Sequence, residues 1–111
     1  MTMEADMSFK KKGPAGFAVH PGEVLRTEFL QPLKMSVYAL AKALQLPVPR
    51  INDIVLQKRG ITPDTAVRLG HFFSISPEFW MNLQTAYELA IARKQAKSEL
   101  KRIRPLEMAG D

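Results

Sequence analysis

The stretch SVYALAKALQLPVPRINDIVLQKRG, residues 36–60, decides the fold of this chain. Ser36 is a good helix N-cap, and the residues behind it have the i, i+3, i+4, i+7 spacing of one buried helical face: Val37, Leu40, Ala41 and Leu44. The second half opens with Pro47 and Pro49, which a helix tolerates because first-turn amides have no partner within the helix. This second helix should end near Leu56, before Gly60, and bury Ile51, Ile54 and Val55.

Two amphipathic helices joined by a turn of about three or four residues pack at a steep angle. Ala41 is small enough to let the two helices approach closely. In a helix-turn-helix, this packing places the outer face of the second helix in the major groove, while the first helix lies across the DNA backbone. The exposed N-terminal half of the second helix then carries the residues that we expect to read bases: Val48, Pro49, Arg50, Asn52 and Asp53.

The chemistry of these five residues suits base recognition. Arg50 can pair with guanine, Asn52 can pair with adenine or support Arg50, and Asp53 can accept a hydrogen bond from cytosine. Val48 or Pro49 can meet a thymine methyl group. The sequence leaves open which of these contacts is made. Phosphate contacts are expected near the first helix and at the far end of the second, from Lys34, Ser36, Tyr38, Lys42, Lys58 and Arg59.

Three further helices are predicted around this pair. One runs from about Pro21 to Leu30 and is ended by Pro32. The others start at Thr62-Pro63-Asp64 and Ser76-Pro77-Glu78, each with a hydroxyl cap, a first-turn proline and an acid near the positive helix end. Their expected core residues are Ala66, Leu69 and Phe73 in the fourth helix and Phe79, Leu83, Ala86, Tyr87 and Ala90 in the fifth. The fold class is therefore all-α, a compact orthogonal bundle of five helices.

The chain divides into three parts by composition. Residues 1–19, which include Lys10–Lys12, have no apolar periodicity and are expected to form a flexible arm. Residues 20–92 form the helix-turn-helix domain, and residues 93–111 form a basic helical extension or tail. Between Arg93 and Arg104 this extension has six cations and one acid. It can be a solvated helix, an extra DNA-backbone contact or a toxin-binding arm.

Bulk properties narrow the function classes. The chain has 111 residues, a net charge of +5 and a pI near 9.8, which favour a polyanionic partner such as DNA, RNA, anionic lipid or an acidic protein.

It has no cysteine, signal peptide or membrane-spanning stretch, so a cytoplasmic protein is expected. His20 and His71 lack clustered ligands, and Glu23 and Glu28 lack a nucleophile. We therefore expect no metal, no cofactor and no catalysis.

The fifth predicted helix is the leading candidate for self-association. A reader of one DNA half-site gains affinity and specificity by pairing with a second copy. The aromatic stretch of this helix can pack in the core or lie on a two-fold interface. The residues assigned to a homodimer interface are Trp80, Leu83 and Tyr87.

Five consecutive blocks of the sequence resemble the HigA family of antitoxins, also known as virulence-associated protein I: HPGEVLRTEFLQPL, ALAKAL, PRINDIV, KRGITPDTAVRL and SPEFWMNLQTAYELA. The match covers residues 20 to about 93. The resemblance implies a λ-repressor-like domain, a homodimer, a palindromic operator in the chain's own promoter and neutralisation of a HigB-type mRNA-degrading toxin.

Three residues depart from the family pattern in the predicted reading region. Gln45 stands at a turn position usually held by glycine, Val37 replaces a commonly polar residue, and Val48 stands where arginine or serine is frequent. Gln45 must therefore adopt a left-handed conformation or a slightly different turn. These differences affect the expected operator sequence rather than the expected fold.

Two other functions fit the same sequence. One is a stand-alone repressor that has no toxin partner. The other is a protein-interaction module in which the helix-turn-helix is vestigial and the basic charge serves an acidic partner or RNA. A DNA reader should protect a short inverted repeat upstream of its own gene and lose affinity steeply with salt, whereas an interaction module should do neither.

Overall fold

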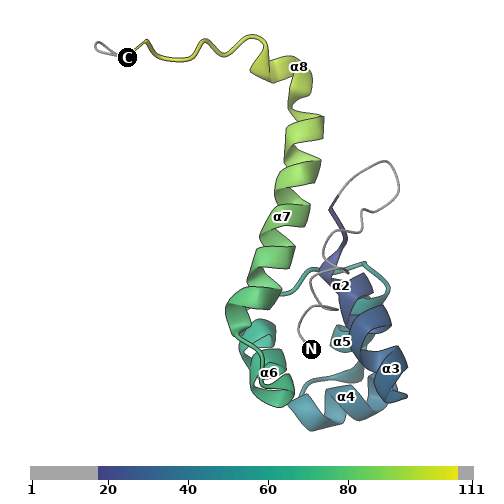
Figure 1. The fold of residues 1–111 in the computed structure, drawn as a ribbon. Coiled ribbons are helices and arrows are strands. Elements are labelled where there is room, and N and C mark those ends of the chain that lie inside the picture. Colours follow the sequence, from purple (N-terminus) through teal and green to yellow (C-terminus); the bar gives the residue numbers. More distant parts are fainter. Residues whose placement is uncertain (1–17, 108–111) are drawn as a thin grey trace.

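Helices account for most of residues 18–107, the part of the chain that the computed structural model describes (Figure 1). Residues 1–17, with Lys10–Lys12, and 108–111 lie outside the described residues. The helical segments are α2 (Pro21–Val24), the π-helical η2 (Leu25–Leu30), α3 (Gln31–Leu33), α4 (Val37–Leu44), α5 (Val48–Val55), α6 (Pro63–Phe73), α7 (Pro77–Gln95) and α8 (Lys97–Leu100). The predicted all-α class is confirmed.

The segments α2, η2 and α3 follow one another without a break, so the prediction that Pro32 ends the first helix is wrong. Pro32 lies inside the last helical turn, directly after the π-helical segment. A π-helical turn is wider than an α-helical one, which relieves the clash between a proline ring and the preceding turn. The helix instead ends at Lys34, whose φ of 54° is left-handed, and Met35 N donates to Leu30 O at 2.9 Å.

The core lies where these helices meet, and Trp80 of α7 is its largest fully buried side chain. The ring of Trp80 packs against Phe29 at a centroid distance of 5.1 Å, and Phe29 packs in turn against Phe73 at 4.8 Å. The other fully buried large apolar side chains come from η2, α4, α5 and α6: Leu25, Leu40, Ile51, Ile54 and Leu69. The aromatic stretch therefore holds α7 against the other helices.

The inward face of α7 differs from the predicted one. Trp80 and Gln84 are its buried residues, whereas Ala86, predicted to be buried, is exposed. The other predicted core residues of α7 are only half-buried: Phe79, Leu83, Tyr87 and Ala90. Apolar residues occupy several faces at the start of α7, so the helical period alone did not identify the buried one.

The predicted N-terminal arm, residues 1–19, also ends earlier in the structure than the sequence predicts. Val19, which we placed in the arm, is buried in the core. His20 then caps α2, since its Nδ1 accepts a hydrogen bond from Gly22 N at 2.8 Å. Gly22 lies so close to α5 that a β-carbon there would overlap the carbonyl oxygen of Ile54. This close approach places α2 directly against the second helix of the predicted DNA-binding pair.

The end of α7 and the whole of α8 extend beyond the bundle (Figure 1). Lys97–Leu100 forms α8, and residues 103–107 have no helical structure. Three apolar residues of this extension are exposed: Leu100, Ile103 and Leu106. Within residues 18–107, no helix is both long and apolar enough to cross a membrane.

Candidate nucleic-acid interface

The first helix of the pair, α4, forms as its sequence predicts. Ser36 Oγ accepts a hydrogen bond from Ala39 N at 2.9 Å and caps the helix. The buried side chains of α4 are Leu40, Ala41 and Leu44, and Val37 packs against the core at its edge. The apolar face of α4 therefore points into the bundle, and its polar face is exposed.

The turn after α4 shows which of the two expected conformations Gln45 adopts, the left-handed one or a different turn. Gln45 is left-handed, with φ 58° and ψ 46°, and Leu46 N donates to Ala41 O at 3.0 Å. This is the Schellman arrangement that glycine usually provides. The turn thus keeps its ordinary geometry, with glutamine in a conformation that costs about 1–2 kcal/mol for a residue with a β-carbon.

The second helix, α5, starts after Pro47 and buries its inner face at Ile51, Ile54 and Val55. The predicted base-reading residues differ in exposure. Pro49 and Asn52 are exposed, whereas Val48, Arg50 and Asp53 are half-buried, and Val48 packs against the core. The first two turns of α5 therefore present Pro49, Asn52 and parts of Arg50 and Asp53 to solvent.

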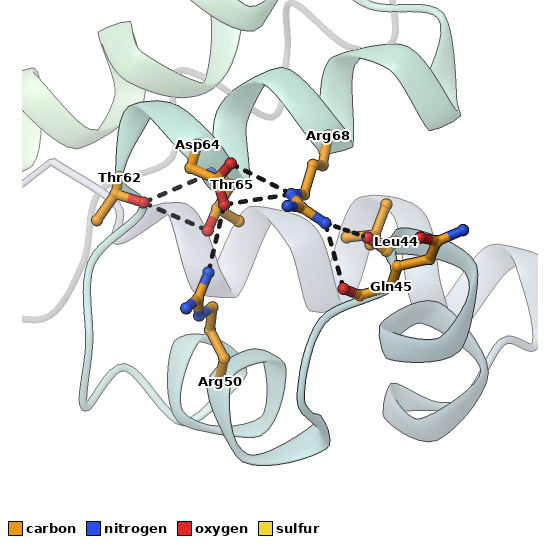
Figure 2. A network of polar contacts seen from close by, with 7 residues as sticks. All are labelled: Leu44, Gln45, Arg50, Thr62, Asp64, Thr65 and Arg68. Atoms are coloured by element: carbon orange, nitrogen blue, oxygen red, sulfur yellow. Dashed lines mark hydrogen bonds and ion pairs between the residues drawn. The ribbon is translucent and has the colours of Figure 1, made fainter.

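Arg50 belongs to a polar network that the sequence analysis did not identify (Figure 2). Its Nη1 lies 3.4 Å from Oδ2 of Asp64 in α6. Asp64 also pairs with Arg68 one turn later, whose Nε lies 3.2 Å from Oδ2. Arg68 Nη1 donates to the carbonyl oxygens of Leu44 at 2.8 Å and Gln45 at 3.2 Å. The i, i+4 spacing of Asp64 and Arg68 signals their mutual pairing. The link to Arg50 has no such local signal.

The predicted phosphate-binding residues are all exposed. They form two groups, one before and on α4 and the other in the loop after α5. Lys34 follows α3, Ser36 caps α4, and Tyr38 and Lys42 lie on α4. Lys42 Nζ is 5.7 Å from the centroid of the Tyr38 ring, within the range of a cation–π contact. Lys58 and Arg59 lie in the loop after α5.

That loop is held by a second group of residues that the sequence analysis missed. Gln57 is left-handed, with φ 63°, and Lys58 N donates to Asp53 O at 2.8 Å. Farther along, Ile61 N donates to Gln84 Oε1 at 2.8 Å, and Gln84 Nε2 donates to Glu88. The available signal was a polar residue, Gln84, on the same face of α7 as Trp80.

The three residues assigned to a dimer interface differ in how much of their surface a second copy could contact. Trp80 has no exposed surface, so its assignment to an interface is wrong, because the core of its own protomer encloses it. Leu83 and Tyr87 are half-buried. The ring of Tyr87 meets the His20 ring edge-on at a centroid distance of 4.8 Å.

The two histidines have different environments. Burial lowers the pKa of His20, although the nearby Glu23 carboxylate acts in the opposite direction. His71 is exposed on α6. Within residues 18–107, no group of three or more acidic, histidine or cysteine side chains is placed to hold a metal ion.

Two short helices in contact, α4 and α5, the Schellman turn that joins them and the exposed residues in the first turns of α5 define a helix-turn-helix protein. No protein-family model matches the chain. It is 51% identical over 81 residues to virulence-associated protein I of Dichelobacter nodosus, covering 73% of this chain and 75% of the relative. It is 32% identical to antitoxin HigA-1 of Vibrio cholerae, covering 79% and 83%. A solved structure of Pseudomonas aeruginosa antitoxin HigA with the higBA promoter superposes with a TM-score of 0.78 at 48% identity, covering 80% of this chain and 98% of that one. The chain belongs to the HigA family of antitoxins.

Proposed function

We propose that this protein is a sequence-specific DNA-binding antitoxin that represses its own operon and neutralises a HigB-type mRNA-degrading toxin. The DNA-binding part of this proposal depends on α5, whose inner face is buried in the core and whose first turns expose polar side chains to solvent. The relative solved with promoter DNA supports the same assignment. Toxin neutralisation rests on family membership. The protein would act by binding, without catalysis.

In this proposal α5 enters the major groove. Arg50 and Asn52 offer donors to guanine and adenine, and Asp53 offers an acceptor to cytosine. Pro49 is exposed and can meet a thymine methyl group, whereas Val48 contributes less because it packs against the core. The exposed cations on either side would hold phosphates and set the register of α5 on the duplex.

A homodimer would read a palindromic operator, since a single α5 covers one half-site. We place the dimer contact on the outer face of α7. Leu83 and Tyr87 are half-buried there, and Ala86 and Leu89 are exposed. Sedimentation of the free protein and of its DNA complex would test the dimer.

The experiment that tests the function is a gel-shift titration of the purified protein against its own upstream DNA and a scrambled duplex, at two salt concentrations. We expect tight, sequence-dependent binding whose log–log salt slope is about 0.9 per phosphate contacted. Weak binding that is indifferent to sequence would contradict the proposal and favour a protein-interaction module.

Adding the toxin separates antitoxin from stand-alone repressor. The toxin would be the product of the gene adjacent to this one. We expect a stable complex with this protein and loss of the toxin's mRNA cleavage. A repressor without a toxin would bind its operator equally well but would leave the mRNA cleavage unchanged.

A further inference from the structure

The Asp64 carboxylate contacts two arginines, Arg50 from α5 and Arg68 from α6 (Figure 2). Arg50 comes from the exposed first turn of α5, and Arg68 reaches from α6 to the end of α4. Asp64 itself is in the first turn of α6, outside the helix-turn-helix. Its side chain is 57% exposed, so it is accessible to solvent beside the proposed reading surface.

Arg50 needs a counter-charge at this position. It lies in the first turn of α5, where the helix dipole is positive and a cation is unfavourable. None of the first-turn residues of α5 is acidic. Asp64 supplies the negative charge from the neighbouring helix, with 3.4 Å between Nη1 and Oδ2. The ion pair uses one of the five donors of the guanidinium and leaves the others available for DNA.

Arg68 connects the same carboxylate to the turn before α5. Its Nη1 donates to the carbonyl oxygens of Leu44 and Gln45, which are left without helical partners at the end of α4. Its Nε donates to Asp64 Oδ1 at 3.3 Å. One carboxylate is therefore bonded both to the Arg50 side chain and to the residue that braces the turn.

We propose that Asp64, supported by Arg68, is a specificity-determining positioning residue. It holds the Arg50 guanidinium in the orientation that reads a base and restrains it from pairing with phosphates at sequences other than the operator. An unrestrained arginine can reach phosphates on any duplex, which adds affinity without selectivity. This inference rests on the proposed sequence-specific DNA binding.

The test compares the full-length protein with its Asp64→Asn variant on the upstream duplex and on the scrambled duplex. We expect the ratio of the two affinities to fall about three- to tenfold, which is part of the discrimination that one bidentate arginine–guanine pair provides. The affinity for scrambled DNA should rise, and its salt slope should steepen by up to about one unit as Arg50 gains a phosphate.

Glu78→Gln is the matched control. Glu78 follows a proline in the first turn of α7, as Asp64 does in α6. Its replacement therefore removes a negative charge from the equivalent position near the positive end of a helix. We expect this variant to keep the wild-type affinity ratio. Asp64→Glu, which retains the charge, should recover part of the discrimination lost in Asp64→Asn. Thermal unfolding of each variant checks that the fold is intact.

A double-mutant cycle tests whether Asp64 acts through Arg50. In an Arg50→Ala background, Asp64→Asn should leave the affinity ratio unchanged. The inference is overturned if Asp64→Asn keeps the wild-type ratio, or if it lowers the ratio equally with and without Arg50. If the wild-type protein itself fails to discriminate, the proposed function is wrong and the inference falls with it.

Discussion

The helix pairs α4–α5 and α6–α7 are built on the same turn but serve different purposes. Each first helix ends at a left-handed residue, Gln45 with φ 58° and Ser74 with φ 59°. Each next residue donates back into the helix, Leu46 N to Ala41 O at 3.0 Å and Ile75 N to Gly70 O at 2.9 Å. Each second helix has a proline in its first turn.

The difference lies in what the first turn of the second helix carries. In α5 that turn has the exposed Pro49 and the half-exposed Arg50. In α7 the same two positions hold Glu78, which is exposed, and Phe79, whose ring packs edge-on against the Trp80 ring. The two turns therefore share their backbone geometry, but the side chains that follow differ: α5 presents a proline and an arginine, whereas α7 packs an aromatic ring against the core.

The largest effect is expected where a glycine lies against the backbone of one of these pairs, Gly22 of α2 against α5 and Gly70 within the α6–α7 pair. In Gly22→Ala the new β-carbon would overlap Ile54 O in α5, and in Gly70→Ala it would overlap Ile75 O in the α6–α7 turn. Backbone cannot move aside as a flexible side chain does, so each should lose about 3 kcal/mol or more of unfolding free energy. Urea unfolding measures this loss. Ala43→Gly on exposed α4 should lose only about 1 kcal/mol, and an equally small loss in Gly22→Ala would refute the close contact.

Arg50→Ala tests whether α5 alone is the reading helix. Operator affinity should weaken by about 1–3 kcal/mol, and specificity should relax, because the proposed contact of Arg50 with guanine would be lost. Lys42→Ala on α4 should weaken binding to the upstream and scrambled duplexes alike. Gel-shift titrations of both variants give the comparison. An unchanged operator affinity in Arg50→Ala would mean that α5 is oriented differently on DNA.

Ser36→Ala and Ser76→Ala remove the N-caps of α4 and α7. Ser36 Oγ accepts from Ala39 N at 2.9 Å and Ser76 Oγ from Glu78 N at 3.1 Å. Each variant should lose about 1 kcal/mol of stability, measured by chemical unfolding. Only Ser36→Ala should also weaken DNA binding, since Ser36 is a proposed phosphate contact. Equal DNA affinities of the two variants would remove Ser36 from the interface.

Gln45→Gly and Ser74→Gly should stabilise the protein. Glycine relieves a left-handed conformation that costs about 1–2 kcal/mol, and part of this gain is offset by about 0.4–1 kcal/mol from the freer unfolded chain. The net gain should be about 0.5–1 kcal/mol for each, seen as a higher melting temperature. If either variant were less stable than the wild-type protein, the native side chain at that position would contribute more stability than its left-handed conformation costs.

The smallest effect concerns His20, which caps α2 and touches Tyr87 of α7. Because burial lowers its pKa in the folded state, the unfolded chain binds more protons. This contribution to stability is complete above about pH 6.5, the ordinary histidine value, and is lost as the pH falls toward the folded pKa. Unfolding measured between pH 7 and pH 5 should show a decline that His20→Asn reduces.

Local chemistry made much of the fold predictable. The starts of α4, α6 and α7 follow from hydroxyl caps that the structure confirms at Ser36, Thr62 and Ser76. The wrong prediction at Pro32 arose because a π-helical segment accommodates a proline that an α-helix would reject. The wrong phase of α7 arose because a polar residue, Gln84, is buried through a hydrogen bond to a distant loop.

The sequence by itself determined where most helices begin and which faces of α4 and α5 are buried, because caps, prolines and helical periodicity act over a few neighbouring residues. Only the tertiary structure decided that Trp80 is core, that Gly22 meets Ile54, and that Asp64 joins Arg50 to the turn at Gln45. Those contacts join residues far apart in the chain. Their pairing depends on how whole helices pack, which no local pattern encodes.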